Sequence, residues 1–163
     1  MSELTIIVAI DLGRAIGRGG DMVYHISDDL KHFKAVTMGH PIIMGRRTFE
    51  SFPKGPLPGR RNIVITRQPD YAREGIEVCA SLHEAISLAG EDAFIIGGGR
   101  VYAQAMPLAT RLIITEVQSD APADADTFFP EIDPKLWRKE SSTPVLTDSR
   151  TGIKYRILTY LRN

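Results

Sequence analysis

Short apolar runs alternate along the chain with longer segments of mixed polarity. The runs are LTIIVAI (4–10), PIIMG (41–45), NIVIT (62–66), IEVCA (76–80), AFIIGG (93–98), RLIITEV (111–117) and KYRILTYLRN (154–163). Several are continuously apolar and too short for helices, which is typical of strands covered on both faces. Residues 153–161 alternate in side-chain character instead, which predicts an antiparallel strand at an edge.

Four helical segments are predicted between these runs, at residues 27–38, 47–52, 81–89 and 101–106. Ser27 and Ser81 are suitable N-cap residues, Glu84 completes a capping box with Ser81, and Gly90 ends that helix. The alternation predicts an α/β fold with one domain over residues 1–163. We expect a central, mainly parallel twisted sheet with helices on both faces and an antiparallel C-terminal edge strand.

Two adjacent aspartates open the first predicted helix, and they face different surroundings. At roughly 100° per residue, Asp29 falls inside the apolar arc. That arc is formed by Ile26, Leu30, Phe33 and Val36. Asp28 falls on the opposite, polar face, which also carries Lys31, His32 and Ala35. A carboxylate in an apolar arc loses solvation unless something compensates, so Asp29 is a candidate for binding a cationic or amidine-like ligand, whereas Asp28 should stay solvated.

Composition narrows the classes of function. Hydrophobic residues make up 43% of the 163 residues, and Lys plus Arg balance Asp plus Glu at 20 each. The chain has no excess of positive charge that would favour binding to nucleic acid or to an anionic membrane. No apolar run approaches the ~18 residues of a membrane span. The single Cys79 excludes an intramolecular disulfide and a cysteine-rich zinc site. We therefore expect a cytoplasmic protein without a metal centre.

Glycine and arginine follow three of the predicted strands, where ligand-binding α/β folds place their chemistry. Arg46, Arg47 and Thr48 begin a helix and form a candidate phosphate site, although a solvated basic turn is an equal alternative. Thr66 and Arg67 follow the next strand. Residues 97–99 are three consecutive glycines, but Tyr102 breaks the G-x-G-x-x-G pattern, so a tight structural turn explains them about as well.

Two loops add candidate chemistry. Residues 14–24 carry Gly17, Gly19 and Gly20, which predicts a mobile segment able to serve as a lid. Residues 52–62 combine three prolines and two glycines with Arg60. A stiff loop of this kind holds a guanidinium in a fixed place, as a carboxylate ligand requires, although a surface arginine is the default interpretation.

These motifs together resemble the bacterial dihydrofolate reductase family over essentially the whole chain, from about residue 4 to 162. They occur in the family's order: AIG, DDLKHFK, PIIMGRRTFES, PLPGRRNIVIT, IIGGGRVY and DTFFP. The resemblance implies reduction of dihydrofolate to tetrahydrofolate, with hydride transfer from NADPH to pterin C6 and a proton reaching N5. A riboflavin-pathway reductase of the same fold and a non-catalytic nucleotide-binding module are the alternatives. The family also implies a monomer.

The resemblance assigns roles position by position. Asp29 would bind the pterin's amino group and N3, supported by Thr115, while Tyr24 stands where the family usually has a tryptophan. We expect the Tyr24 hydroxyl to hold a water near the pterin. The other substrate positions are Ile7, Val8, Leu30, Phe33, Leu57, Arg60 and Ile96. The cofactor positions are Ala9, Ile16, Gly17, Gly45, Arg46, Arg47, Thr48, Thr66, Arg67, Gly97, Gly98, Gly99, Arg100, Val101 and Tyr102, with a cis bond expected within the three glycines.

Overall fold

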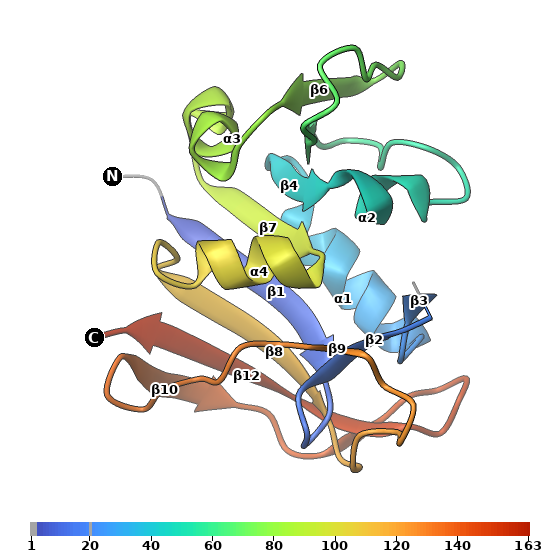
Figure 1. The fold of residues 1–163 in the computed structure, drawn as a ribbon. Coiled ribbons are helices and arrows are strands. Elements are labelled where there is room, and N and C mark those ends of the chain that lie inside the picture. Colours follow the sequence, from blue (N-terminus) through green and yellow to red (C-terminus); the bar gives the residue numbers. More distant parts are fainter. Residues whose placement is uncertain (1–2, 20) are drawn as a thin grey trace.

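The apolar runs pair into one large sheet in the computed structural model, which describes residues 3–19 and 21–163 (Figure 1). Its strands are β1 (Leu4–Ile10), β4 (Ile42–Gly45), β5 (Asn62–Ile65), β6 (Ile76–Cys79), β7 (Ala93–Gly97), β8 (Arg111–Val117), β10 (Trp137–Ser142), β11 (Leu146–Thr147) and β12 (Lys154–Arg162). The helices are α1 (Ser27–Thr37), α2 (Arg46–Glu50), α3 (Leu82–Ala89) and α4 (Gly99–Ala105). The four predicted helices are confirmed, with no end shifted by more than two residues.

The order of the strands confirms a mainly parallel sheet. Along the sheet the strands run β10-β12-β8-β1-β7-β4-β5-β6, and β11 pairs with β12. From β8 through β6 every pairing is parallel, whereas β12 pairs antiparallel with β8. The predicted antiparallel strand near the C-terminus is therefore confirmed. Outside it lies β10, an additional antiparallel strand that the hydrophobic pattern did not predict.

Alternating side chains of the central strands divide the core between the two faces of the sheet. Ile6 and Val8 of β1 join a cluster with the apolar residues of α3 and α4. Ile7 joins the cluster on the other face, against which Phe33 of α1 and Leu57 pack. Helices therefore cover both faces, as predicted, and the α1 face carries Asp29.

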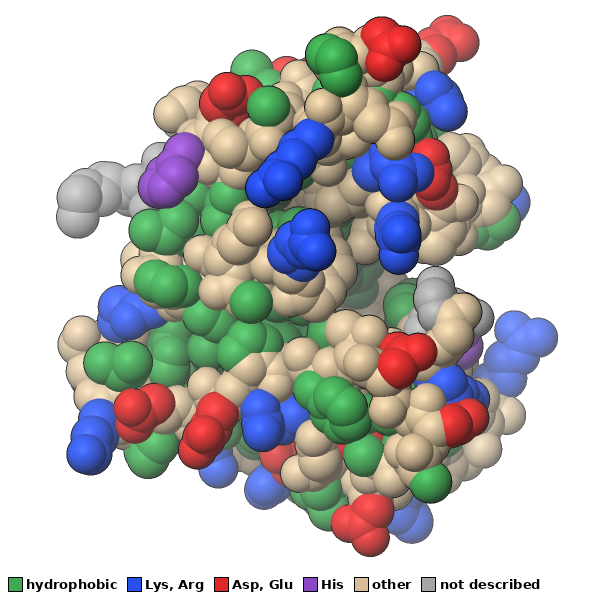
Figure 2. All heavy atoms as spheres, in the orientation of Figure 1, with side chains coloured by type: hydrophobic (Ala, Val, Ile, Leu, Met, Phe, Trp, Pro, Cys, Tyr) green, Lys and Arg blue, Asp and Glu red, His purple; other side chains and the backbone are tan. Residues whose placement is uncertain are grey.

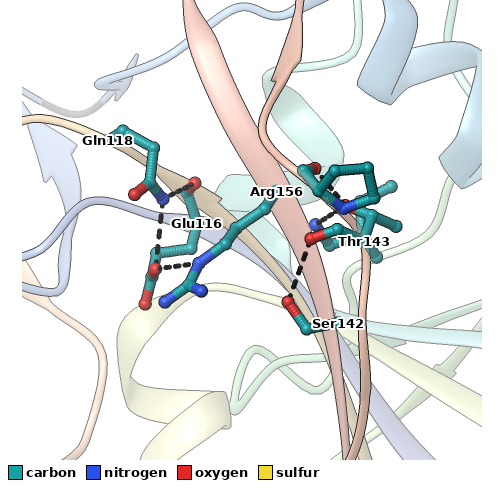
Figure 3. A network of polar contacts seen from close by, with 7 residues as sticks. Glu116, Gln118, Ser142, Thr143 and Arg156 are labelled. Atoms are coloured by element: carbon teal, nitrogen blue, oxygen red, sulfur yellow. Dashed lines mark hydrogen bonds and ion pairs between the residues drawn. The ribbon is translucent and has the colours of Figure 1, made fainter.

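Polar contacts join β12 to β8 one residue beyond Thr115 (Figure 3). Arg156 Nε donates to Glu116 Oε1 at 2.9 Å, and Gln118 Nε2 donates to the same oxygen at 3.1 Å. In this antiparallel ladder the neighbouring pair is Ile157 with Thr115. The interaction holds β12 in register where Thr115 enters the site.

The predicted lid is more ordered than a simple loop. Its residues form β2 (Ala15–Arg18) and β3 (Asp21–Met22), which pair with β9 (Thr127–Phe128) in a small second sheet. Gly19 N–H donates to Asp126 Oδ2 at 2.9 Å, which ties the hairpin to the segment before β9. Gly20, which the sequence placed in the lid, lies outside the described residues.

Candidate active site

Asp29 occupies a half-enclosed position between α1 and β8. Thr115 Oγ1 donates to Asp29 Oδ1 at 2.5 Å, and only 19% of the aspartate side chain is exposed. Burial raises the pKa of the Asp29 carboxyl, while the Thr115 hydrogen bond and nearby His32 oppose that shift. The predicted pair of Asp29 and Thr115 is therefore together in the structure. A carboxylate held this way is suited to binding a ligand with paired N–H donors.

The start of α1 differs from the prediction, because Ser27 is not its cap. Ile26 is the N-cap residue, and its side chain cannot accept a hydrogen bond. Asp148, from the turn between β11 and β12, accepts from Ser27 Oγ and from Asp28 N–H at 3.1 and 2.8 Å. These bonds, and others from Thr151, hold the pKa of Asp148 well below its ordinary value. A distant carboxylate thus replaces the local cap and fixes α1.

Asp28 is not simply solvated either. Its carboxylate accepts from Ser149 N–H at 2.9 Å and from Ser149 Oγ at 2.7 Å. The two aspartates therefore have separate tasks: Asp28 joins α1 to the β11–β12 turn, and Asp29 faces the site.

The prediction from helical periodicity was also wrong for His32, which it placed on the polar face with Asp28. His32 Nδ1 lies 4.0 Å from Asp29 Oδ1, one helical turn away. Positions i and i+3 are neighbours on a helix surface, so the imidazole lies next to the carboxylate.

Arg60 is held in place by its own loop and by α1. Its Nε donates to the Pro58 carbonyl at 3.0 Å, and one guanidinium nitrogen donates to Thr37 Oγ1 at 3.2 Å. Buried Asn62 fixes the loop by exchanging hydrogen bonds with the backbone of Leu57. The guanidinium keeps further N–H donors for a carboxylate. Sequence analysis identified Arg60 and the stiff loop, but missed Thr37 and Asn62.

The predicted substrate walls lie mostly on the α1 face. Phe33, Leu57 and Ile96 pack against the cluster that contains Ile7. Leu30 is 53% exposed, as suits a wall that a ligand would cover. Val8 is the exception, because its side chain belongs to the core on the opposite face. Only the backbone of Val8 is therefore available to a ligand on the Asp29 side.

The three glycines bring the predicted cofactor residues together. The Gly97–Gly98 peptide bond is cis, as expected. A Cβ atom added at Gly97 would lie 3.4 Å from Thr48 Oγ1, and one added at Gly45 would lie 3.4 Å from Val101. At Gly99 an added Cβ would meet Thr127 at 2.6 Å and Ile16 at 3.7 Å. A side chain is disfavoured at Gly97 by its φ of 130° and at Gly99 by the close approach of Thr127, where α2, α4 and the small sheet converge.

Basic side chains surround this junction. Figure 2 shows Lys and Arg gathered over the region of α2 and α4, beside a hollow in this face of the molecule. Arg47, Arg67 and Arg100 are exposed, whereas Arg46 donates to Glu50 on its own helix at 2.7 Å. Thr66 accepts from the Gln68 N–H. The exposed guanidiniums are suited to an anionic, phosphate-bearing ligand.

Two tyrosine hydroxyls have partners that the sequence did not predict. Tyr24 donates to Asp11 Oδ2 at 2.7 Å, while Asp11 Oδ1 accepts from the N–H groups of Gly13 and Ala15. The hydrogen of the Tyr24 hydroxyl is therefore donated to Asp11, so a water could bond to this hydroxyl only by donating to its oxygen. Buried Tyr102 donates to the Ile7 carbonyl at 3.0 Å. Burial raises the pKa of the Tyr102 phenol, and the charge of Asp29 adds to that shift.

Within the described residues, no group of His, Cys, Asp and Glu has the arrangement needed to hold a metal ion. None of the described helices is long and apolar enough to cross a membrane.

Known proteins match this chain in sequence and in structure over nearly its full length. The family model described as dihydrofolate reductase matches residues 3–162. The chain is 49% identical to a dihydrofolate reductase of Neisseria gonorrhoeae, with 99% of both chains covered, and 45% identical to one of Mycobacterium tuberculosis, with 100% of both covered. Among solved structures, it matches dihydrofolate reductase from Enterococcus faecalis complexed with NADP(H) and RAB-propyl. That match has a TM-score of 0.88 and 36% identity over 99% of this chain and 96% of the other.

Proposed function

Since the chain belongs to the dihydrofolate reductase family and reduces dihydrofolate with NADPH, we propose which of its residues carry out that reaction. Asp29 is the group that binds and polarises the pterin. The observation that carries this assignment is the half-enclosed carboxylate, with Thr115 on one oxygen and apolar side chains around it. Such a site favours a ligand that donates hydrogen bonds to a carboxylate.

The rest of the substrate follows from the surrounding residues. The carbonyls of Ile7 and Ile96 accept from the pterin amine; Ile7 already accepts from Tyr102, and a carbonyl oxygen has a second lone pair. Leu30, Phe33 and Leu57 enclose the rings, and the backbone of Val8 lies beside them. Arg60, fixed by Thr37, binds the terminal carboxylate of the substrate.

The residues around the glycine turn fit NADPH, because they combine close backbone approach with exposed positive charge. Arg46, Arg47, Thr48, Thr66 and Arg67 would bind its phosphates. The backbone of Ala9 and Ile16 would hold the nicotinamide carboxamide, beside Gly17. The remaining contacts would come from Gly45, Gly97, Gly98, Gly99, Arg100, Val101 and Tyr102. When bound, NADPH supplies the hydride.

Asp29 contributes electrostatics rather than the proton itself. Bound at the amino end of the pterin, its carboxylate lies too far along the ring to reach N5, by the geometry of the family. Its negative charge raises the basicity of the substrate, and water delivers the proton. Burial strengthens this effect, because a charge in a poorly solvated site is less screened.

The test is Asp29→Asn, followed by single-turnover hydride transfer across a range of pH. An amide cannot support protonation of N5, so the rate at neutral pH should fall sharply and recover in part in acid. Asp28→Asn is the matched control and should change the rate less than about twofold, since Asp28 faces Ser149. A native rate for Asp29→Asn at pH 7 would remove Asp29 from the mechanism.

Three further assignments stay predictions. They are a monomeric state, a cytoplasmic location and a single reductase domain over residues 1–163, of which the family match covers 3–162. Size-exclusion chromatography with light scattering tests the first. The riboflavin-pathway reductase and the non-catalytic module have no support from the family assignment.

A further inference from the structure

His32 places a second ionisable group against Asp29. Its Nδ1 atom lies 4.0 Å from Asp29 Oδ1, and it is buried without a hydrogen-bond partner among the described residues. The imidazole as a whole is 30% exposed, so the ring extends from solvent to the carboxylate. A buried ring nitrogen without a partner is costly, and the nearest charge that could satisfy it is Asp29.

None of the other groups that face Asp29 carries a positive charge that could stabilise its carboxylate. Thr115 of β8 donates a neutral hydrogen bond, and the charge of Asp148 from the β11–β12 turn opposes ionisation of Asp29. Tyr102 of α4 and Tyr155 of β12 are phenols whose pKa values are raised, by burial first and by nearby carboxylates including Asp29. Among the described residues, His32 is thus the one neighbour whose positive charge favours the carboxylate.

We propose that His32 is a positioning residue for the reductase reaction: its protonated imidazole donates from Nδ1 toward Asp29 and thereby sets how the reaction depends on pH. The proposal rests on the proposed role of Asp29. Histidine is the side chain that ordinarily changes charge between pH 5 and 8. The proton enters from solvent through the exposed part of the ring and leaves by the same route.

The consequence for catalysis follows from the sign of the charges. The protonated pterin N5 and the protonated His32 both depend on the negative charge of Asp29, and each disfavours the other. At acid pH the His32 cation partly neutralises Asp29 and weakens its support for N5. Removing the imidazole should therefore move the midpoint of the hydride-transfer profile to higher pH.

The first experiment needs no ligand. The ring NMR signals of His32 are titrated in the parent protein and in Asp29→Asn, with exposed His83 of α3 as an internal control. Losing the carboxylate should lower the His32 midpoint by several tenths of a pH unit, the scale of two opposite charges 4.0 Å apart in a largely aqueous setting. The His83 midpoint should not move. Identical His32 midpoints in both proteins would overturn the pairing.

The second experiment measures single-turnover hydride transfer against pH in His32→Gln and His32→Phe, with His83→Gln as the matched control. Both His32 variants should raise the midpoint of the profile by several tenths of a pH unit or more, and His83→Gln should not. Unchanged profiles in both His32 variants would overturn the catalytic part of the proposal. A native rate in Asp29→Asn would instead overturn the proposed function, whereas the ligand-free titration would still decide the pairing.

Discussion

Asp28 and Asp29 carry the same carboxyl group into two different surroundings. Asp28 accepts two hydrogen bonds from Ser149, whereas Asp29 has one from Thr115 and apolar neighbours around it. One residue of helix rotates a side chain by about 100°, which is enough to separate a structural group from a functional one. The sequence predicted this division, although not the partner of Asp28.

Tyr24 is the residue whose interpretation changes most. The sequence suggested a hydroxyl that holds a water, but the hydroxyl donates to buried Asp11, which also accepts from two backbone N–H groups. Tyr24 and Asp11 lie at the two ends of the β2–β3 segment. The hydrogen bond therefore closes that segment at its base.

Tyr24→Phe should lower the free energy of unfolding by about 1–2 kcal/mol, because a buried carboxylate oxygen loses its donor. The measurement is urea unfolding of Tyr24→Phe, Asp11→Asn and the double variant. If the bond is the cause, the double variant should lose less than the sum of the two single variants. Unchanged stability with a slower hydride step would instead support the water-holding role.

At the scale of the element, α1 depends on a carboxylate far away in the sequence. Ser27 and Asp148 are separated by 121 positions, and no local pattern indicates their contact. The sequence TDSRTG has the composition of a turn, but which helix it caps depends on the pairing of β12 with β8. Since α1 also carries Asp29, this turn orients the site.

Asp148→Ala should lower the melting temperature by about 4 °C or more, the scale of a lost helix cap in a protein of this size. Because the pKa of Asp148 is depressed in the folded protein, its contribution is complete above the unfolded value near ~3.9 and is lost only as pH falls toward the folded value. Thermal unfolding at several pH values checks this. Exposed Asp70→Ala serves as control, and an equal effect there would contradict the capping role.

The arginines that follow β4 and β5 should together select NADPH over NADH. Replacing Arg46 and Arg67 with Leu should raise KM for NADPH by about tenfold or more, because charge-assisted hydrogen bonds to a phosphate are lost, and that for NADH by about twofold at most. Steady-state kinetics with both cofactors measures the difference. Arg138→Leu, exposed on β10, is the control. Equal losses for both cofactors would assign the arginines to the pyrophosphate or to folding.

The elements that the sequence predicted share a physical signal, and those it missed lack it. The central strands are continuously apolar because both of their faces are covered, so their composition marks them. In β10, Trp137 is buried and the other side chains are exposed, so backbone pairing with β12 holds the strand without a hydrophobic pattern. The two-residue strands β3 and β9 are likewise too short to show an alternation of hydrophobic and polar side chains.

At the scale of the whole molecule, the site lies where the parallel strands end. Asp11 follows β1, Arg46 follows β4, Thr66 follows β5, and Gly98 follows β7, all at one edge of the sheet. Parallel pairing makes this convergence predictable, since carboxyl ends must meet. The contacts of Asp11, His32, Asn62 and Asp148 were not predictable, because each depends on the packed arrangement rather than on local sequence.

A half-buried functional carboxylate should also cost the molecule stability. Because burial raises the pKa of Asp29, the folded protein disfavours its ionised form, and the cost is complete above the folded pKa and absent below the unfolded value near ~3.9. In ligand-free protein at pH 7, Asp29→Asn should therefore raise the free energy of unfolding by on the order of 1 kcal/mol. The amide oxygen introduced by this substitution can still accept from Thr115.

Urea unfolding at neutral and acid pH would measure this gain, which should vanish as pH falls below about 4. Asp28→Asn is the contrasting variant, and it should gain nothing because its carboxylate already accepts from Ser149. With folate added, the parent protein should become more stable than Asp29→Asn. Folate binds the parent more tightly and so raises its free energy of unfolding by mass action. An Asp29→Asn protein no more stable than the parent at pH 7 would mean that Thr115 and His32 fully compensate the buried charge.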